Sequence, residues 1–284
     1  MADFFRLSMV GKPRHPTKPT NKWRMNMNIK MSKPKPARLI IYGPSGIGKT
    51  TLPIGYDGMR GSDAPVFVLT EDGLGDLVVP VIGPETESDE PSICKSFEDV
   101  LEALVFLGTE EHDFKTVVID SLDWLEPLIW NATCRRLGVS SIEAPGYGKG
   151  YVEAGREWYQ FFEYLTALRD SKQMTVVLLA HSQIIRVEDP QHPAYDMHGL
   201  KLHKRAAALS AEYADVIGFA STKTFTTTEE AGFGQKRTRA VSTGERVLHL
   251  VGSAAYVAKN RYHMPDSVNL TWESLAEFLP HLEE

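Results

Sequence analysis

Six short apolar runs divide the chain, and polar or glycine-containing segments separate them. Runs of this length are typical of strands that are buried in a sheet. With 284 residues, the chain is long enough for one large α/β domain or two small ones. The expected strands are Leu39–Tyr42, Pro65–Thr70, Thr116–Ser121, Thr175–Ala180, Tyr213–Ala220 and Arg246–Leu250.

Helical spacing of apolar residues marks four further segments. A capping-box pattern at 96–99 begins a helix whose apolar spacing covers 97–105, and a small helix is expected near 272–278. A helix is predicted over 122–137, where Pro127 either kinks it or marks its true start. Another is predicted over 152–169, with an aromatic face that belongs to the core or to a subunit interface. This face consists of Trp158, Phe161, Phe162 and Leu165.

Three polar segments show neither the apolar runs of strands nor the apolar spacing of helices. Residues 76–90 are acidic and contain prolines, which predicts an exposed loop. Residues 184–204 contain two prolines and three histidines in a spacing that matches no metal site, so we expect a mobile loop. The Thr-, Gly- and Lys-rich stretch 222–239 predicts a hairpin or a loop.

Charge is distributed unevenly along the chain. The net charge is −6, but residues 1–38 carry ten Lys or Arg against Asp3 alone, which leaves −15 on the remainder. This basic segment also contains five prolines and no sustained periodicity. We therefore predict a flexible arm over 1–36 and a folded core over 37–284. The arm could contact nucleic acid phosphates or act as a solubilising tail, and the sequence leaves both open.

Composition excludes several classes of protein. The two cysteines, Cys94 and Cys134, lie far apart and suggest neither a zinc site nor a disulfide framework, which fits a reducing cytoplasm. No apolar run approaches the length of a membrane span, and no signal-peptide core follows the N-terminus. The sequence predicts a soluble cytoplasmic protein without a membrane partner.

One motif of specific chemistry follows the first strand. The octapeptide 43–50 matches G-x-x-x-x-G-K-[ST] between a strand and a helix. Its glycines let backbone N–H groups approach phosphate oxygens, and the helix N-terminus adds donors. Lys49 can reach the β- and γ-phosphates, and the Thr50 hydroxyl can bind Mg²⁺. We predict an ATP and Mg²⁺ site formed by Gly43, Pro44, Ser45, Gly46, Ile47, Gly48, Lys49, Thr50 and Thr51.

An acidic residue on a later strand completes the predicted magnesium site. Asp120 ends the apolar run of the third expected strand, as does the aspartate on the magnesium side of P-loop enzymes. Any buried strand can end in Asp, so the assignment depends on the P-loop upstream.

Two segments have the composition of a single-strand nucleic acid contact. Three glycines alternate with Tyr147, Lys149 and Tyr151, which offer stacking faces and a phosphate partner. The alternative is an ordinary flexible loop. A second, basic segment suits a phosphate backbone, through Lys201, Lys204 and Arg205.

The order of these features resembles the RecA recombinase core over roughly residues 37–265. The resemblance implies a mostly parallel sheet flanked by helices, with Glu71 as the catalytic glutamate and Asp120 at the magnesium ion. It places Gln183 where a strand-end glutamine senses the γ-phosphate, before a second DNA-binding loop at 184–204. The stretch Lys259-Asn260-Arg261 resembles the one that reaches a neighbouring subunit's nucleotide.

Short length and the 180–183 and 259–261 stretches look most like phage-encoded RecA-like ATPases associated with single-strand annealing. The resemblance implies a DNA-stimulated, Mg²⁺-dependent ATPase that binds single-stranded DNA as a homo-oligomer, either a ring or a filament. A single-strand-binding protein is a candidate partner. Three features depart from the pattern: no sizeable extra domain is present, the second loop has no match, and Asp72 follows Glu71 and could share its role.

The sequence leaves three other functions open. A hexameric helicase shares this core and a similar cation, although such enzymes usually carry an additional N-terminal domain. A non-catalytic module would use ATP only to assemble on DNA or on a partner. A small-molecule kinase ranks last, because the sequence shows no evident acceptor pocket.

Overall fold

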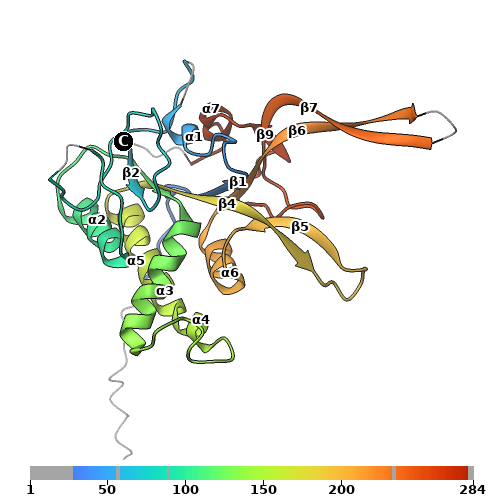
Figure 1. Cartoon of the computed structure of the whole chain (residues 1–284). Helices are drawn as coiled ribbons and strands as arrows, with labels where there is room; N and C mark the ends of the chain where they lie inside the picture. The colour runs from blue at the N-terminus through green and yellow to red at the C-terminus, as the bar shows by residue number, and fades with distance from the viewer. Residues whose placement is uncertain (1–27, 56–57, 88–89, 232–234, 281–284) are drawn as a thin grey trace, which may run out of the picture. The chain divides into compact units, whose positions relative to one another are not determined.

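A computed structural model describes residues 28–55, 58–87, 90–231 and 235–280 (Figure 1). Contacts within the chain define two units, 1–33 and 34–284, and the labelled helices and strands belong to the second. Most of the predicted basic arm lies outside the described residues. No helix among those described is long and apolar enough to cross a membrane.

The core of this unit is a sheet with the strand order β2-β3-β4-β1-β6-β7-β9. The first five of these strands are parallel, whereas β7 and β9 run antiparallel to their neighbours. The mostly parallel α/β fold that the sequence predicts is therefore confirmed. The strands are β1 Arg38–Gly43, β2 Pro65–Leu69, β3 Thr116–Asp120, β4 Thr175–Val187, β6 Val216–Ala231, β7 Gln235–His249 and β9 Ser267–Asn269.

Both faces of the sheet are covered, which explains why its strands are continuously apolar. Successive side chains of β1 alternate between two buried clusters, with Ile40 and Tyr42 in one and Leu39 and Ile41 in the other. The aromatic face predicted near residue 160 is buried in the first cluster, so it belongs to the core. That cluster includes α2 Phe97–Thr109, α3 Leu122–Leu137, α5 Gly155–Ser171 and α6 Lys204–Tyr213; the second includes α1 Thr51–Ile54 and α7 Trp272–Ala276.

Local helix signals in the sequence were accurate. The capping box forms, because Ser96 Oγ accepts from the Asp99 N–H at 3.1 Å and the Asp99 carboxylate accepts from the Ser96 N–H at 2.9 Å. Helix α3 begins at Leu122, so Pro127 lies within the helix rather than at its start.

The predicted mobile loop at 184–204 is wrong. Strand β4 continues to Val187 and pairs with β5, Tyr195–Leu200, in an antiparallel hairpin, and α6 begins at Lys204 (Figure 1). Pro190 and Pro193 lie only in the turn between these strands. The prediction failed because half-exposed strands contain many polar residues and therefore look like a loop in the sequence. Their backbone hydrogen bonds are made between the two strands, which residue type alone does not show.

Two boundaries also differ from the sequence expectation. Tyr213 ends α6 rather than beginning a strand, and β6 starts at Val216. The helix expected over 152–169 is instead α4, Lys149–Glu153, followed directly by α5. The stretch 222–239 belongs to the β6–β7 hairpin, except for 232–234, which lie outside the described residues.

Candidate nucleotide site

The phosphate loop leaves the carboxyl end of β1 and enters α1. Gly46 and Gly48 have positive φ values of 75° and 103°, which favour glycine. A Cβ on Gly48 would lie 2.8 Å from the end of the Arg246 side chain, which would have to move, and the φ of 103° would strain any other residue there. Pro44, Ser45 and Gly46 are exposed, which leaves this part of the loop accessible.

Lys49 is buried inside this loop, with 7% of its surface exposed. Its ammonium group donates to the carbonyl oxygens of Pro44, at 3.1 Å, and Gly43, at 3.4 Å. Burial lowers the pKa of Lys49, although Asp120 and other carboxylates nearby oppose this. Its hydrogen bonds are to neutral carbonyl groups, so phosphate oxygens are better partners for this charge.

The structure brings together the two residues predicted for Mg²⁺. Thr50 Oγ1 donates to Asp120 Oδ2 at 2.8 Å, and Asp120 is only 4% exposed. Burial raises the pKa of Asp120, as expected for a buried carboxyl group with a neutral partner. A hydroxyl and a carboxylate are hard oxygen ligands that fit Mg²⁺, which would neutralise charge on the phosphates.

The described residues contain no group of three or more His, Cys, Asp or Glu side chains that could bind a metal on their own.

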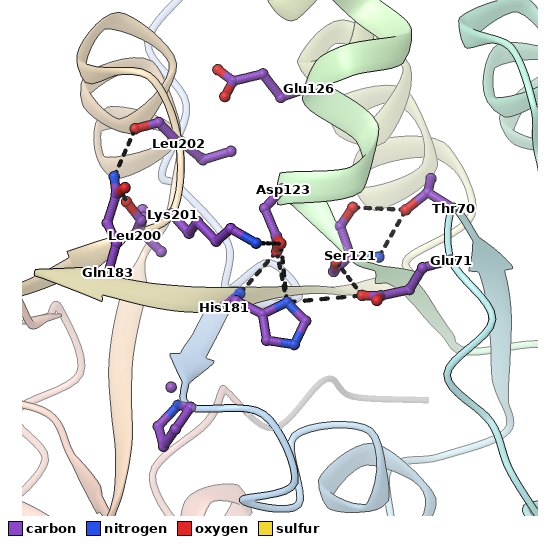
Figure 2. Close-up of polar contacts among 12 residues, drawn as sticks. Thr70, Glu71, Ser121, Asp123, Glu126, His181, Gln183, Leu200, Lys201 and Leu202 are labelled. Atoms are coloured by element: carbon purple, nitrogen blue, oxygen red, sulfur yellow. Dashed lines mark hydrogen bonds and ion pairs between the residues drawn. The ribbon is translucent and has the colours of Figure 1, made fainter.

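Glu71 follows β2 and lies beside the end of β3 (Figure 2). Ser121 Oγ donates to Glu71 Oε1 at 2.5 Å, and His181 Nδ1 lies 4.0 Å from the same oxygen. Thr70 fixes this junction, because its hydroxyl donates to the Ser121 carbonyl and accepts from the Ser121 N–H. Asp72, by contrast, is exposed. Of the two acids, Glu71 is therefore the one in contact with the site.

His181 is a site residue that sequence reasoning missed. It lies on β4 opposite Gly43, level with the start of the phosphate loop. Asp123 accepts from its backbone N–H at 2.9 Å and contacts its Nδ1 at 3.0 Å (Figure 2). The available signal was a polar residue directly after the apolar run that ends at Ala180.

The tautomer of His181 follows from the state of Asp123. Burial alone would raise the pKa of Asp123, but hydrogen bonds from His181 and its charge lower it overall. Asp123 is therefore ionised at neutral pH and can only accept, so His181 Nδ1 carries a proton. Lys201 Nζ lies 3.6 Å from the same carboxylate.

Gln183, predicted to sense the γ-phosphate, makes two hydrogen bonds within the chain, and its sensor role stays a prediction. Its side-chain Nε2 donates to the carbonyl oxygens of Leu200, at 2.9 Å, and Leu202, at 3.1 Å (Figure 2). The amide thus ties β4 to the end of β5. His181 rather than Gln183 is the residue of this strand that contacts Glu71.

The predicted nucleic acid loop around Tyr147 is only partly free. Tyr147 is fully exposed, but Lys149 and Tyr151 lie in α4. The ring of Tyr151 stacks on His203 with 4.0 Å between centroids and 9° between planes, and its hydroxyl bonds to Glu143. One face of the Tyr151 ring is therefore covered by His203, and its contact with nucleic acid stays a prediction.

The second basic segment connects to the site through α3. Lys201, Lys204 and Arg205 are all exposed. Between them, the His203 N–H donates to both carboxylate oxygens of Glu126, at 2.9 and 3.1 Å. Glu126 is 5% exposed, and burial raises its pKa to about 7.

The two cations predicted to act on a neighbour lie at the opposite end of β1. Lys259 Nζ donates to the carbonyl oxygens of Ala211 and Ala214, at 2.6 and 2.7 Å. Arg261 forms a 3.1 Å ion pair with Asp215, which also binds Arg38, the first residue of β1. The phosphate loop begins at the other end of this strand, roughly 16 Å away at the rise of a β-strand.

Comparison with known proteins agrees with this geometry. A search of curated proteins finds no match to the chain. A family model described as AAA domain matches residues 35–262, a range that includes the phosphate loop, Asp120, His181 and Arg261. The chain therefore belongs to the AAA domain family and is a P-loop ATPase.

Proposed function

We propose that this ATPase is a RecA-like recombination protein that binds single-stranded DNA and promotes annealing or strand pairing. One observation carries the proposal: an unbroken series of contacts joins Glu71 to His181, His181 to Asp123, and Asp123 to the exposed Lys201. The series connects the carboxylate beside the phosphates to the basic segment that would contact a DNA backbone.

Glu71 is suited to orient and deprotonate the attacking water. Its carboxylate is held by the Ser121 hydroxyl, so its direction is fixed before a substrate arrives. Lys49 supplies positive charge at the transferring phosphate, and Thr50 and Asp120 are the residues for Mg²⁺. His181 Nε2, the ring nitrogen that does not face Asp123, is available as a polar contact at the phosphates.

The same contacts can carry nucleotide state to the DNA segment. Asp123 accepts hydrogen bonds from His181 and forms an ion pair with Lys201. A movement of His181 would therefore move the Asp123 carboxylate and change its attraction for Lys201. Glu126, one turn further along α3, binds the backbone beside Lys204 and Arg205. Helix α3 would therefore connect the nucleotide site to the proposed DNA segment through these contacts.

The position of Arg261 supports the proposed homo-oligomer. Its side chain is 51% exposed at the amino end of β1, whereas the phosphate loop of the same chain is at the carboxyl end. Its proposed role is therefore at the nucleotide of another copy, and Lys259 would act in the same way if it left its carbonyl partners. A cation supplied in this way is worth about 10³–10⁵ in rate.

Steady-state ATP hydrolysis, measured with and without single-stranded DNA over a range of protein concentrations, tests this function. Stimulation by DNA, with a rate that rises more steeply than linearly with protein, is the expected result. A hydrolysis rate that does not change with DNA would contradict the recombination proposal, while the assignment as a P-loop ATPase would still hold. Adding a single-strand-binding protein to annealing assays tests that partner separately.

A further inference from the structure

A cavity of about 760 Å³ opens beside the phosphate loop and is not used by the nucleotide site described above. Its walls come from the middle of β4, from β5, from the paired strands β6 and β7, from the segment after β7, and from β9. Pro44 and Ser182 form its border with the phosphate loop. The β4–β5 and β6–β7 hairpins extend outward from this region (Figure 1).

Four rings that line this cavity form a stacked group, the ring cluster: His198, Phe219, His249 and Tyr256. The Phe219 ring lies 4.9 Å from His198 and 5.2 Å from Tyr256, with planes 22° and 23° apart. His249 and Tyr256 lie 4.5 Å apart. Phe219 is buried, whereas the other three are half-buried. Nearly parallel ring faces at a cavity wall are a surface on which another planar group can stack.

The polar lining of the cavity is almost entirely neutral. Hydroxyl and amide groups come from Ser221, Thr222, Ser267 and Asn269. The two charged residues, Lys223 and Glu245, form an ion pair with each other at 3.1 Å. Burial lowers the pKa of His249, which accordingly adds a neutral imidazole near pH 7. The lining therefore suits a planar, uncharged group with hydrogen-bonding edges better than it suits a phosphate.

The base of the bound ATP belongs elsewhere. Lys49 and Thr50 are the residues for the β- and γ-phosphates and Mg²⁺, so the nucleoside is expected past Thr51. On that side, Thr51, Arg246 and Trp272 line only a hollow of about 10 Å³, so the position of the base follows from the order of the motif and not from a cavity. The cavity beside Pro44 is at the opposite end of the loop and is free for a different ligand.

We propose that the ring cluster is a base-stacking site, and that it takes a base of a single-stranded nucleic acid. The inference rests on the proposed function, which it deepens by moving the stacking site from Tyr151 to Tyr256. Stacking of a base on an aromatic side chain depends little on sequence, as a recombination protein requires. The position of the site next to Pro44 places a bound base beside the γ-phosphate end of the loop.

The test compares two fluorescein-labelled probes of about 16 nucleotides, one oligothymidylate and one abasic strand with the same backbone. Fluorescence anisotropy gives the affinity of each probe for the full chain with ATP. The unaltered protein should prefer the probe that carries bases. In Tyr256→Leu, which keeps apolar volume but loses the ring, the affinity for oligothymidylate should fall about tenfold and that for the abasic strand should not change.

One control variant and one further test variant show whether the aromatic rings are responsible. Tyr256→Phe keeps the stacking face and should behave as the unaltered protein. His249→Leu removes a second ring of the cluster and should reduce the preference for bases in the same direction. Hydrolysis of ATP without DNA verifies that each variant folds, because neither residue belongs to the nucleotide site described above.

The possible outcomes separate the two proposals. Binding of both probes by the unaltered protein, with a base preference that survives in Tyr256→Leu, would overturn the stacking site and leave the function intact. Absence of binding to either probe would overturn the function itself. If Tyr256→Leu instead weakens binding of a fluorescent ATP analogue, the cavity takes the nucleotide's base and the proposal is wrong.

Discussion

Two buried aspartates at opposite ends of the parallel strands, Asp120 at the end of β3 and Asp215 just before β6, are in opposite electrostatic situations. At the carboxyl end, Asp120 receives a hydrogen bond from the neutral Thr50, and burial raises its pKa. At the amino end, burial of Asp215 is outweighed by Arg38 and Arg169, and its pKa is lowered. Both carboxyl groups are nearly inaccessible, so depth alone does not explain the difference.

The difference lies in where the compensating charge comes from. Asp215 forms ion pairs with Arg38, Arg169 and Arg261 of its own chain, at 2.8, 3.7 and 3.1 Å. Asp120 and Lys49 lie in a site whose charges match those of a magnesium nucleotide. The charge of Asp215 is thus compensated by arginines of the same chain. The charges of Asp120 and Lys49 would be compensated by a ligand, and without it they cost some stability.

Arg261→Ala should have the largest effect. Because Asp215 keeps Arg38 and Arg169, we expect the fold and ATP binding to persist while hydrolysis falls about 10³–10⁵-fold. Arg135→Ala, which removes an exposed ion pair with Glu98, is the matched control and should hydrolyse ATP normally.

A mixing experiment shows whether Arg261 acts on another subunit. Lys49→Ala has a defective phosphate loop and an intact Arg261, and Arg261→Ala has the reverse, so mixed oligomers should recover part of the activity. Failure of the mixture to exceed the two separate proteins would contradict action between subunits.

Glu71→Gln should reduce hydrolysis by about 10²–10⁴-fold, the usual contribution of a general base. The glutamine oxygen can still accept from Ser121, so binding of ATP should change little. Asp72→Asn, one residue further along and exposed, is the matched control. Single-turnover kinetics distinguish the two; a larger loss in Asp72→Asn would assign the base to that residue instead.

Asp215→Asn should lower the free energy of unfolding by about 3–5 kcal/mol, because Arg38 and Arg169 remain largely buried without their charge partner. Urea unfolding measures this loss. The pKa of Asp215 is lowered in the folded state, so its contribution is present at neutral pH and disappears as pH falls below about 3.9, the unfolded value. The difference between variant and unaltered protein should therefore shrink in acid.

Asp170→Asn is the control for that measurement. Its ion pair with Lys35 is exposed on both sides, so the loss should not exceed about 1 kcal/mol. Equal losses in the two variants would contradict the importance of burial at Asp215.

Glu126→Gln should give the smallest effect, and it should be stabilising. Burial raises the pKa of Glu126 to about 7, so ionisation is disfavoured in the folded state. Stability is therefore lost as pH rises from about 4.3, the unfolded value, to about 7. Because the amide oxygen can still accept from the His203 N–H, the variant should gain about 1–3 kcal/mol at pH 8 and nothing at pH 4.

Thermal or urea unfolding at both pH values checks this prediction. Glu110→Gln, at an exposed position after α2, serves as the control. A pH-independent change in Glu126→Gln would mean that packing rather than charge determines the effect.

The sequence determined the parts of this protein that depend on neighbours along the chain. Apolar runs fixed the parallel strands because both faces of the sheet are buried, and the capping box fixed the start of α2. The phosphate loop is likewise a local structure, in which Gly48, Lys49 and Thr50 follow one another.

Tertiary structure decided everything that depends on residues distant in sequence. Three features arise from pairing between separate segments. These are the β4–β5 hairpin, the position of His181 opposite Gly43, and the stacking of Tyr151 on His203. The ring cluster draws on four such segments, and the position of Arg261 follows from its ion pair with Asp215. These contacts depend on which strand ends lie next to each other in the sheet, and residue spacing along the chain does not predict that order.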